Sequence, residues 1–213
     1  MTKKPLQNPT LSSNGIILEP AKKEGPKDQS ILREIDYHID VNRRVIYYTG
    51  PIDIHTAEFI NHRIDKICDL TNNYKASIDL DLVSPGGDVY GMLGAIDVIR
   101  SAPVDINIIG RGMIMSAASL ILMSGTGQRS LEKNSTVMIH NIRSWVEGSS
   151  SDIIAEVDHL KKLQDIVYKL YAEFSNKPKK FWASKKNIDW YLTPFECYQL
   201  GLIDIINGVK NGP

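Results

Sequence analysis

The amino-acid sequence predicts an α/β protein with a largely parallel sheet, and three observations lead to this fold class. Residues 78–82 alternate apolar and polar side chains, which is typical of a strand with one buried face. Apolar side chains recur at helical spacing on both sides of that strand. A second apolar run, rich in isoleucine, follows at residues 106–109. Strands that alternate with helices of about 10 to 15 residues indicate parallel strands joined by helical crossovers.

The compact part of the chain is expected to begin near Asp36. Residues 45–48 form a β-branched and aromatic run that residues 49–51 (Thr-Gly-Pro) close, and this pattern predicts the first core strand. From Thr56 onward the apolar spacing becomes helical. The apolar stripe of this helix consists of Ala57, Ile60, Ile64 and Ile67.

Glycine-rich segments follow the next two strands. Residues 84–87 (Ser-Pro-Gly-Gly) end the alternating strand, and a helix with Met92, Ile96 and Ile99 on one face comes next. Residues 110–116 contain two further glycines and are expected to form a second turn. A short apolar helix at residues 117–124 is expected after it.

The second half of the chain contains two further helices. Residues 152–174 repeat apolar side chains at threes and fours, which predicts a long amphipathic helix. Its apolar stripe needs a partner, either across the domain or, as we favour, in another subunit. In the last helix we expect Thr193 as N-cap, Pro194 at the first position, Glu196 three residues after the cap and Gly201 as the stop.

Composition excludes several classes of function. The 25 basic and 25 acidic residues cancel, so no overall positive charge favours nucleic acid or an anionic membrane. The longest apolar run, residues 113–123, contains two serines and is shorter than the roughly 20 residues that a spanning helix needs. We expect no secretory signal, because no apolar stretch follows Met1. Cys68 and Cys197 lack metal-type spacing and are expected to be reduced thiols, so we expect a cytoplasmic protein. From the balanced charge and the short apolar run, we expect no nucleic-acid or membrane partner.

The first turn and the start of the apolar helix are the places where chemistry is expected. In α/β sheets, ligands bind at the carboxyl ends of the strands. The glycine pair of residues 84–87 allows backbone N–H groups to approach a bound anion or carbonyl. Ser116, which precedes the apolar helix, is either a simple N-cap or a nucleophile whose oxyanion is bound by free N–H groups.

A nucleophilic serine needs a base and an acid that orients the base. His140 is the candidate base because it closes the apolar strand at residues 137–139, whereas the other four histidines (His38, His55, His62 and His159) are expected on the surface or beside the N-terminal arm. Asp189 is the best candidate acid because it lies among apolar neighbours. Spacing alone leaves Asp152 and Asp204 as alternatives, although Asp152 is also suited to capping the long helix.

Several blocks of the sequence together resemble the Clp protease proteolytic subunits, the ClpP family of serine peptidases. The resemblance runs from about Arg44 to Ile206. Its blocks are residues 44–50, residues 84–87, the stretch around Ser116, residues 134–140, residues 191–193 and residues 201–204. On the family pattern, Ser116 is the nucleophile, His140 the general base and Asp189 the acid of the triad. Gly87 and Ala117 occupy the positions whose N–H groups form the family's oxyanion hole.

The resemblance also implies an architecture, partners and a division into domains. It implies a ClpP/crotonase-like spiral of β-β-α units with a long handle helix, and two stacked heptameric rings of identical subunits. The substrates would be unfolded polypeptides, fed by a AAA+ unfoldase of the ClpX, ClpA or ClpC kind, with no cofactor or metal bound by this chain. The serine peptidase domain would span residues 36–208, after an N-terminal arm or propeptide at residues 1–35 and before a C-terminal tail at residues 209–213.

Three features depart from the family pattern. Asp79 and Asp81 stand where the family usually carries aromatic side chains that receive ATPase loops. Ile188 stands where an arginine is common. The first 30 or so residues exceed the family's short N-terminal segment and contain four of the ten prolines.

The sequence therefore predicts an ATP-dependent, Clp-type serine endopeptidase. The alternatives are a non-catalytic ring subunit with a structural or regulatory role, and an acyl-CoA enzyme of the crotonase type, which shares the fold.

Overall fold

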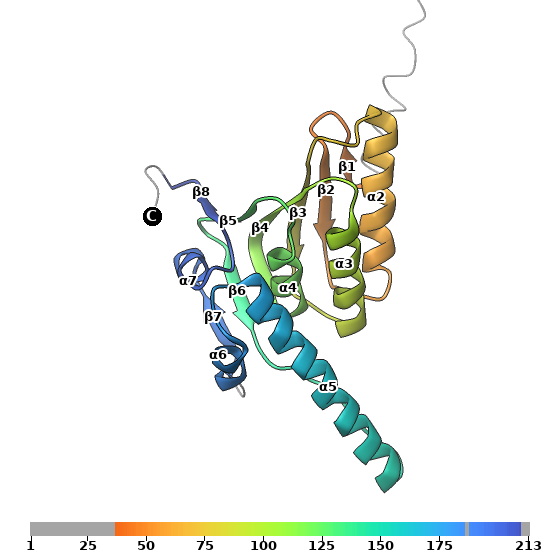
Figure 1. Ribbon diagram of the computed structural model, residues 1–213, viewed down its shortest axis with the longest axis vertical. Helices are drawn as coiled ribbons and strands as arrows, with labels where there is room; N and C mark the ends of the chain where they lie inside the picture. The colour runs from red at the N-terminus through yellow and green to blue at the C-terminus, as the bar shows by residue number, and fades with distance from the viewer. Residues whose placement is uncertain (1–36, 186–187, 210–213) are drawn as a thin grey trace, which may run out of the picture.

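The computed structural model describes residues 37–185 and 188–209, so the predicted arm and the end of the predicted tail lie outside the described residues. A single mixed sheet forms the centre of the molecule (Figure 1). Its strands are β1 (Ile39–Asp40), β2 (Val45–Thr49), β3 (Ile78–Ser84), β4 (Ile106–Met115), β5 (Arg129–Glu132), β6 (Thr136–Ile139), β7 (Trp190–Leu192) and β8 (Ile205–Asn207). The helices are α2 (Thr56–Thr71), α3 (Val89–Ser101), α4 (Ala117–Met123), α5 (Ser150–Phe174), α6 (Lys179–Ser184) and α7 (Pro194–Leu200).

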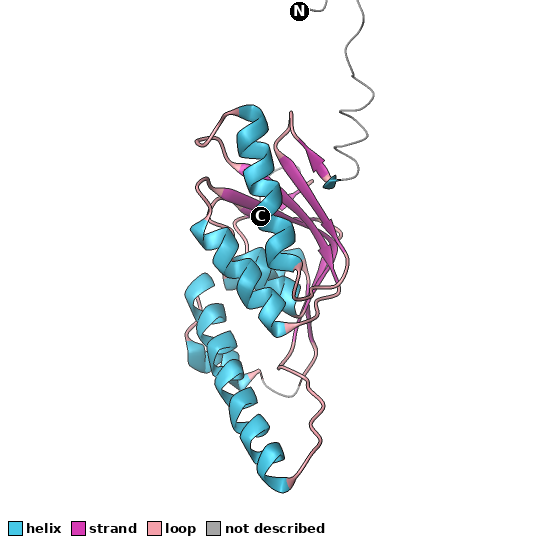
Figure 2. Ribbon diagram, turned by 90° about the vertical axis from the view of Figure 1, so that its right-hand side faces the viewer, coloured by secondary structure: helices cyan, strands magenta, loops and turns pink. Residues whose placement is uncertain are grey.

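The strand order confirms the predicted α/β class. Strands run in the order β1-β2-β3-β4-β5-β8, and β6 pairs with both β4 and β7. The pairs are parallel except β1 with β2 and β6 with β7. Figure 2 shows α2, α3 and α4 on one side of the sheet, as parallel strands with helical crossovers require.

Periodicity in the sequence accounts for the core between sheet and helices. In β3 the side chains of Ile78, Leu80 and Leu82 are buried while those between them are half-buried, so the strand presents one apolar face. In α2 the predicted stripe is buried at Ile60 and Ile64, among other positions. These faces meet in one continuous hydrophobic cluster that also includes α3 and α4.

The turn predicted at residues 110–116 is wrong, because β4 continues through it to Met115. The ladder between β3 and β4 shifts register there: Leu82 pairs with Gly110, but Ser84 pairs with Ile114. Beyond the shift, β4 exchanges its partner β5 for β6. The glycines thus mark an irregularity within a strand, and this irregularity carries the chain toward β6.

Helix α5 begins with a capping box and projects away from the sheet. Ser149 accepts a hydrogen bond from the N–H of Asp152, and the Asp152 carboxylate accepts one from the N–H of Ser149. Asp152 is thus the partner of the cap rather than the cap itself. The second half of the helix packs on the body, whereas its first turns extend beyond the body (Figures 1 and 2). Ile153, Ile154 and Val157 are exposed there.

Helix α7 has the predicted boundaries. Thr193 and Glu196 form a capping box, Pro194 occupies the first turn, and Gly201 ends the helix with φ 74°. Within residues 37–185 and 188–209, no helix combines the length and apolar character that crossing a membrane requires.

The two unusual carboxylates of β3 are engaged in polar contacts. Asp81 forms an ion pair with Arg111 at 2.6 Å, and Arg111 also contacts Glu132 at 2.7 Å. Asp79 accepts a hydrogen bond from the Asn107 amide at 2.8 Å. The face where the family pattern carries aromatic side chains is therefore a polar network here.

Candidate active site

The loop at residues 84–87 lies directly against the start of α4. Gly86 has φ 88°, and a Cβ atom there would lie 2.4 Å from the Met115 carbonyl oxygen and 2.7 Å from the Ser116 Cβ. The backbone nitrogen of Ala117 lies 3.1 Å from the same point. Only glycine permits both this φ and this approach. As a result, Gly87 and Ala117 reach the same pocket, and neither N–H group has an acceptor among the described residues.

Ser116 has a backbone conformation that is rare for a residue with a side chain. Its φ is 55° and its ψ is −122°, and such conformations cost about 1 to 3 kcal/mol. Its N–H donates to the Met138 carbonyl at 2.7 Å, which ties it to β6. The hydroxyl makes no capping bond to α4, so it remains available for a partner outside the helix.

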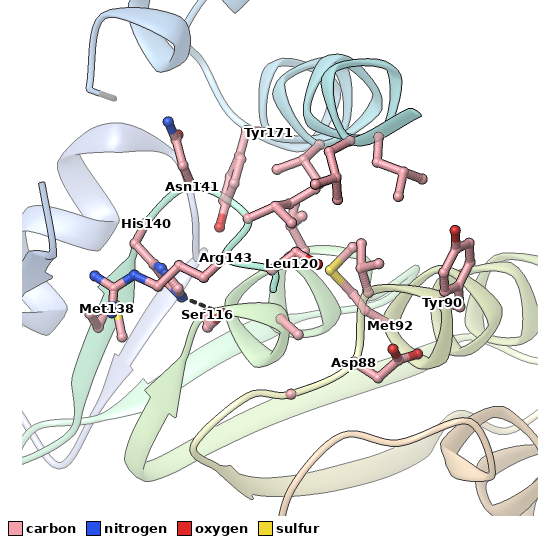
Figure 3. Close-up of a pocket in the computed structure, with 18 of the residues that line it drawn as sticks. Asp88, Tyr90, Met92, Ser116, Leu120, Met138, His140, Asn141, Arg143 and Tyr171 are labelled. Carbon is pink, nitrogen blue, oxygen red and sulfur yellow. Dashed lines mark hydrogen bonds between the residues drawn. The ribbon is translucent and has the colours of Figure 1, made fainter. Parts of the chain in front are cut away.

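That partner is His140, which follows β6 as predicted. The distance from His140 Nε2 to Ser116 Oγ is 2.7 Å. Figure 3 shows the two side chains facing each other. Burial of the imidazole, followed by the nearby Arg143 guanidinium, lowers the pKa of His140 below its usual 6.5, and Asp189 opposes this effect. The imidazole is therefore neutral at pH 7, and one ring nitrogen is able to accept a proton.

Asp189 is close enough to affect the pKa of His140 but forms no hydrogen bond with it. Its carboxylate forms an ion pair with Arg143, a residue that the sequence reasoning did not single out. The second imidazole nitrogen, Nδ1 of His140, is buried and has no hydrogen-bond partner among the described residues. The structure thus brings Ser116 and His140 together, and leaves Asp189 at the edge of the site.

The other candidates lie away from the site. Asp152 belongs to the capping box of α5, and Asp204 is bound by Arg129 at 2.6 Å. The four other histidines are exposed, and His159 contacts the hydroxyl of Tyr90. No group of three or more His, Cys, Asp and Glu side chains suited to a metal ion occurs in the described part of the chain.

A pocket of about 470 Å³ opens beside Ser116. Helices α3, α4 and α5 supply its apolar walls, and Figure 3 shows Met92 and Tyr90 across the pocket from the Ser116–His140 pair. Polar side chains at its margin include Asp88, Arg143 and Glu156. The apolar wall residues include Met92, Leu120, Leu160, Leu163 and Val167. Such a pocket combines the apolar lining and the few polar groups that are typical of ligand sites, and it lies next to Ser116.

Comparison with known proteins agrees with this fold. The sequence model of the Clp protease family matches residues 32–210. The ATP-dependent Clp protease proteolytic subunit of Bacteroides fragilis is 32% identical over 163 residues, which cover 76% of this chain and 77% of the relative. Proteins of the same name from Bacteroides thetaiotaomicron and Deinococcus radiodurans are 29% and 28% identical, covering 91% and 76% of this chain and 92% and 78% of theirs. This chain belongs to the Clp protease family.

Proposed function

We propose that the protein is a serine endopeptidase that cleaves unfolded polypeptides by acyl transfer to Ser116. The observation that carries the proposal is the 2.7 Å contact between Ser116 Oγ and His140 Nε2, beside two N–H groups without acceptors. A serine hydroxyl is hardly ionised at neutral pH, so a neutral imidazole at hydrogen-bond distance is the base it requires.

The reaction has two acyl-transfer steps. Ser116 Oγ attacks the scissile carbonyl while His140 Nε2 accepts its proton, and the N–H groups of Gly87 and Ala117 bind the oxyanion. His140 then returns the proton to the leaving amine, the C–N bond breaks, and an ester to Ser116 remains. Water, deprotonated by His140, hydrolyses that ester and restores the serine. Each oxyanion donor contributes about 3 to 4 kcal/mol to lowering the barrier.

Asp189 completes the triad in this proposal by moving from Arg143 to His140. When Nε2 accepts the serine proton, Nδ1 must carry a proton, and this buried donor has no partner among the described residues. The side chains of Arg143 and Asp189 are 68% and 35% exposed, so water and salt weaken their attraction. Displacement of the carboxylate from Arg143 then lets it accept from Nδ1–H and stabilise the imidazolium.

The proposal extends to assembly and partners. The subunits form two stacked heptameric rings, with α5 as the handle between rings, and a AAA+ unfoldase delivers the substrate. The exposed apolar side chains at the start of α5 support a role in assembly, and the name of the relatives, ATP-dependent Clp protease proteolytic subunit, supports the ATPase partner. The rings would work in the cytoplasm, where the buried thiols of Cys68 and Cys197 stay reduced.

Replacement of the nucleophile tests the proposal. We expect Ser116→Ala to lower hydrolysis of a fluorogenic peptide by at least about a thousandfold and to abolish labelling by a fluorophosphonate. Ser101→Ala, which alters an exposed serine in α3, is the control and should keep both peptide hydrolysis and fluorophosphonate labelling. Equal hydrolysis by Ser116→Ala and the parent would show that the nucleophile is misassigned.

One observation favours a second candidate function, a non-catalytic ring subunit with a structural or regulatory role. The acid of the triad is engaged by Arg143 instead of His140. Under this alternative the parent assembles into rings, but Ser116 resists the fluorophosphonate. Labelling of Ser116 in the assembled parent would exclude it.

A further inference from the structure

A chain of hydroxyl groups connects α5 to the backbone of Ser116. The Ser119 hydroxyl, on the first turn of α4, donates to the Ser116 carbonyl oxygen at 2.6 Å. The Tyr171 hydroxyl lies 2.7 Å from the Ser119 oxygen. Ser119 and Tyr171 are only 1% and 3% exposed, so water does not replace these bonds. Figure 3 shows Tyr171 extending from α5 toward the site.

The direction of both hydrogen bonds follows from the number of protons. Ser119 has one hydroxyl proton, and it goes to the Ser116 carbonyl. Tyr171 must therefore be the donor to Ser119. Burial raises the pKa of Tyr171, which keeps its hydroxyl protonated and able to donate. Donation to Ser119 also polarises the Ser119 hydroxyl and strengthens its bond to the carbonyl.

The carbonyl of Ser116 shares a peptide plane with the N–H of Ala117. The peptide is trans, so the two groups point in opposite directions, and fixing one fixes the other. The carbonyl also accepts from the N–H of Ser119 at 2.9 Å, so two bonds hold it. Because a positive φ at Ser116 is unfavourable, such bonds are needed to keep this peptide in one orientation.

We propose that Tyr171 is a positioning residue that, through Ser119, aims the Ala117 N–H at the oxyanion. The inference rests on the proposed function and deepens it. The ring of Tyr171 is itself held, because it stacks on Trp182 with centroids 4.9 Å apart. The hydroxyl chain acts on the developing oxyanion more than on the bound substrate, so it affects kcat more than KM.

The test is a double-mutant cycle measured with a fluorogenic peptide on fully assembled protein. We expect Tyr171→Phe to lower kcat by about 3- to 10-fold, with KM within about twofold of the parent. In a Ser119→Ala background, Tyr171→Phe should cause no further loss, because the intermediate hydroxyl is absent. Tyr74→Phe removes a tyrosine hydroxyl that contacts Asp69 near the start of β3, at the opposite end of that strand from residues 84–87, and should leave kcat unchanged.

Three results would overturn the inference: an unchanged kcat in Tyr171→Phe, an equal loss in the Ser119→Ala background, or a change confined to KM. If the parent hydrolyses no peptide at all, the proposed function fails, and crystal structures decide the inference separately. The Ser116–Ala117 peptide is then expected to show a second orientation in Tyr171→Phe and a single orientation in Tyr74→Phe. A single orientation in both variants would contradict the role of Tyr171.

Discussion

Two opposite charges act on His140 at the edge of the site. Arg143 lowers the pKa of the imidazole and Asp189 raises it, and the two side chains are paired with each other. Arg143 therefore acts twice against the catalytic arrangement, since it repels the imidazolium and also engages the carboxylate that would stabilise it. A single substitution should reverse both effects.

We expect Arg143→Gln to shift the pH dependence of Ser116 labelling toward higher pH. Activity requires neutral His140, so it rises with pH through the pKa of His140. Loss of the cation raises that pKa, and a bond from Nδ1–H to the freed Asp189 raises it further. Above this pKa, labelling should be faster than in the parent. The measurement is the rate of fluorophosphonate labelling between about pH 5 and 9.

Arg43→Gln is the matched control, because Arg43 forms an exposed ion pair with Asp40 away from the site. Its labelling profile should coincide with that of the parent. A midpoint that moves to lower pH in Arg143→Gln would refute the opposing roles of Arg143 and Asp189.

Sequence reasoning singled out Ser116 because it begins an apolar helix, and His140 because it closes an apolar strand. Such boundaries are visible in the order of residue types. The pairing of Asp189 with Arg143 was not visible, because the two residues are 46 positions apart and the contact depends on how the loop after His140 folds back. Tyr171 was also missed, since its hydroxyl lies within an otherwise apolar helical stripe.

At the scale of the element, the loop at residues 84–87 determines the shape of the site. Gly86 contacts the backbone of Met115 and Ala117 and the side chain of Ser116, so a side chain at this position would separate the loop from α4. The hydroxyl of Ser84 accepts from the N–H of Gly86 at 3.1 Å and stabilises the turn. Because of the close approach at Gly86, a single added Cβ atom there would change the distance between Gly87 and Ala117.

We expect Gly86→Ala to abolish peptide hydrolysis and to lower the free energy of unfolding by about 2 to 4 kcal/mol, from backbone strain and steric overlap together. Gly112→Ala is the control: its φ is 60°, but no atom lies within 4 Å of the added Cβ. It should lose only about 1 kcal/mol. Urea denaturation measures the free energy of unfolding of both variants. An equal loss in the two would show that the structure relieves the steric overlap at Gly86 without a cost in stability.

The elements that the sequence predicted well have either a clear period or two terminal signals. Strand β3 alternates strictly, and α7 carries both a capping box and a terminal glycine. Strands β5, β7 and β8 were not predicted, because each is at most four residues long and is stabilised by pairing with distant strands. The extension of β4 through its glycines likewise depends on pairing with β6, and no local pattern specifies which strands pair.

At the scale of the whole molecule, α5 is the element that the body leaves uncovered. The exposed fraction of Ile154 is 63%, and Ile153 and Val157 are each 38% exposed. The sequence predicted an apolar stripe on this helix, including Ile153 and Val157 but not Ile154, and its need for a partner. Apolar side chains gathered on one projecting helix are typical of a surface that another subunit covers.

Ile154→Glu is expected to separate the stacked rings and to lower the native mass of the assembly by about half, because a carboxylate cannot be buried unpaired. Lys162→Glu places a carboxylate on the exposed face of the same helix and should keep the parental mass. Native mass spectrometry compares the two. Full-size assemblies of Ile154→Glu would place the contact between rings elsewhere.

Helix α5 also supplies one wall of the pocket beside Ser116, through Leu160, Leu163 and Val167, and carries Tyr171. Under the proposed function, peptide recognition and subunit association therefore both depend on the position of this helix. Thermodynamic reciprocity then requires that whatever factor association adds to peptide affinity, peptide adds to association. Dilution that dissociates the subunits is therefore expected to weaken peptide binding, and bound peptide is expected to oppose the dissociation.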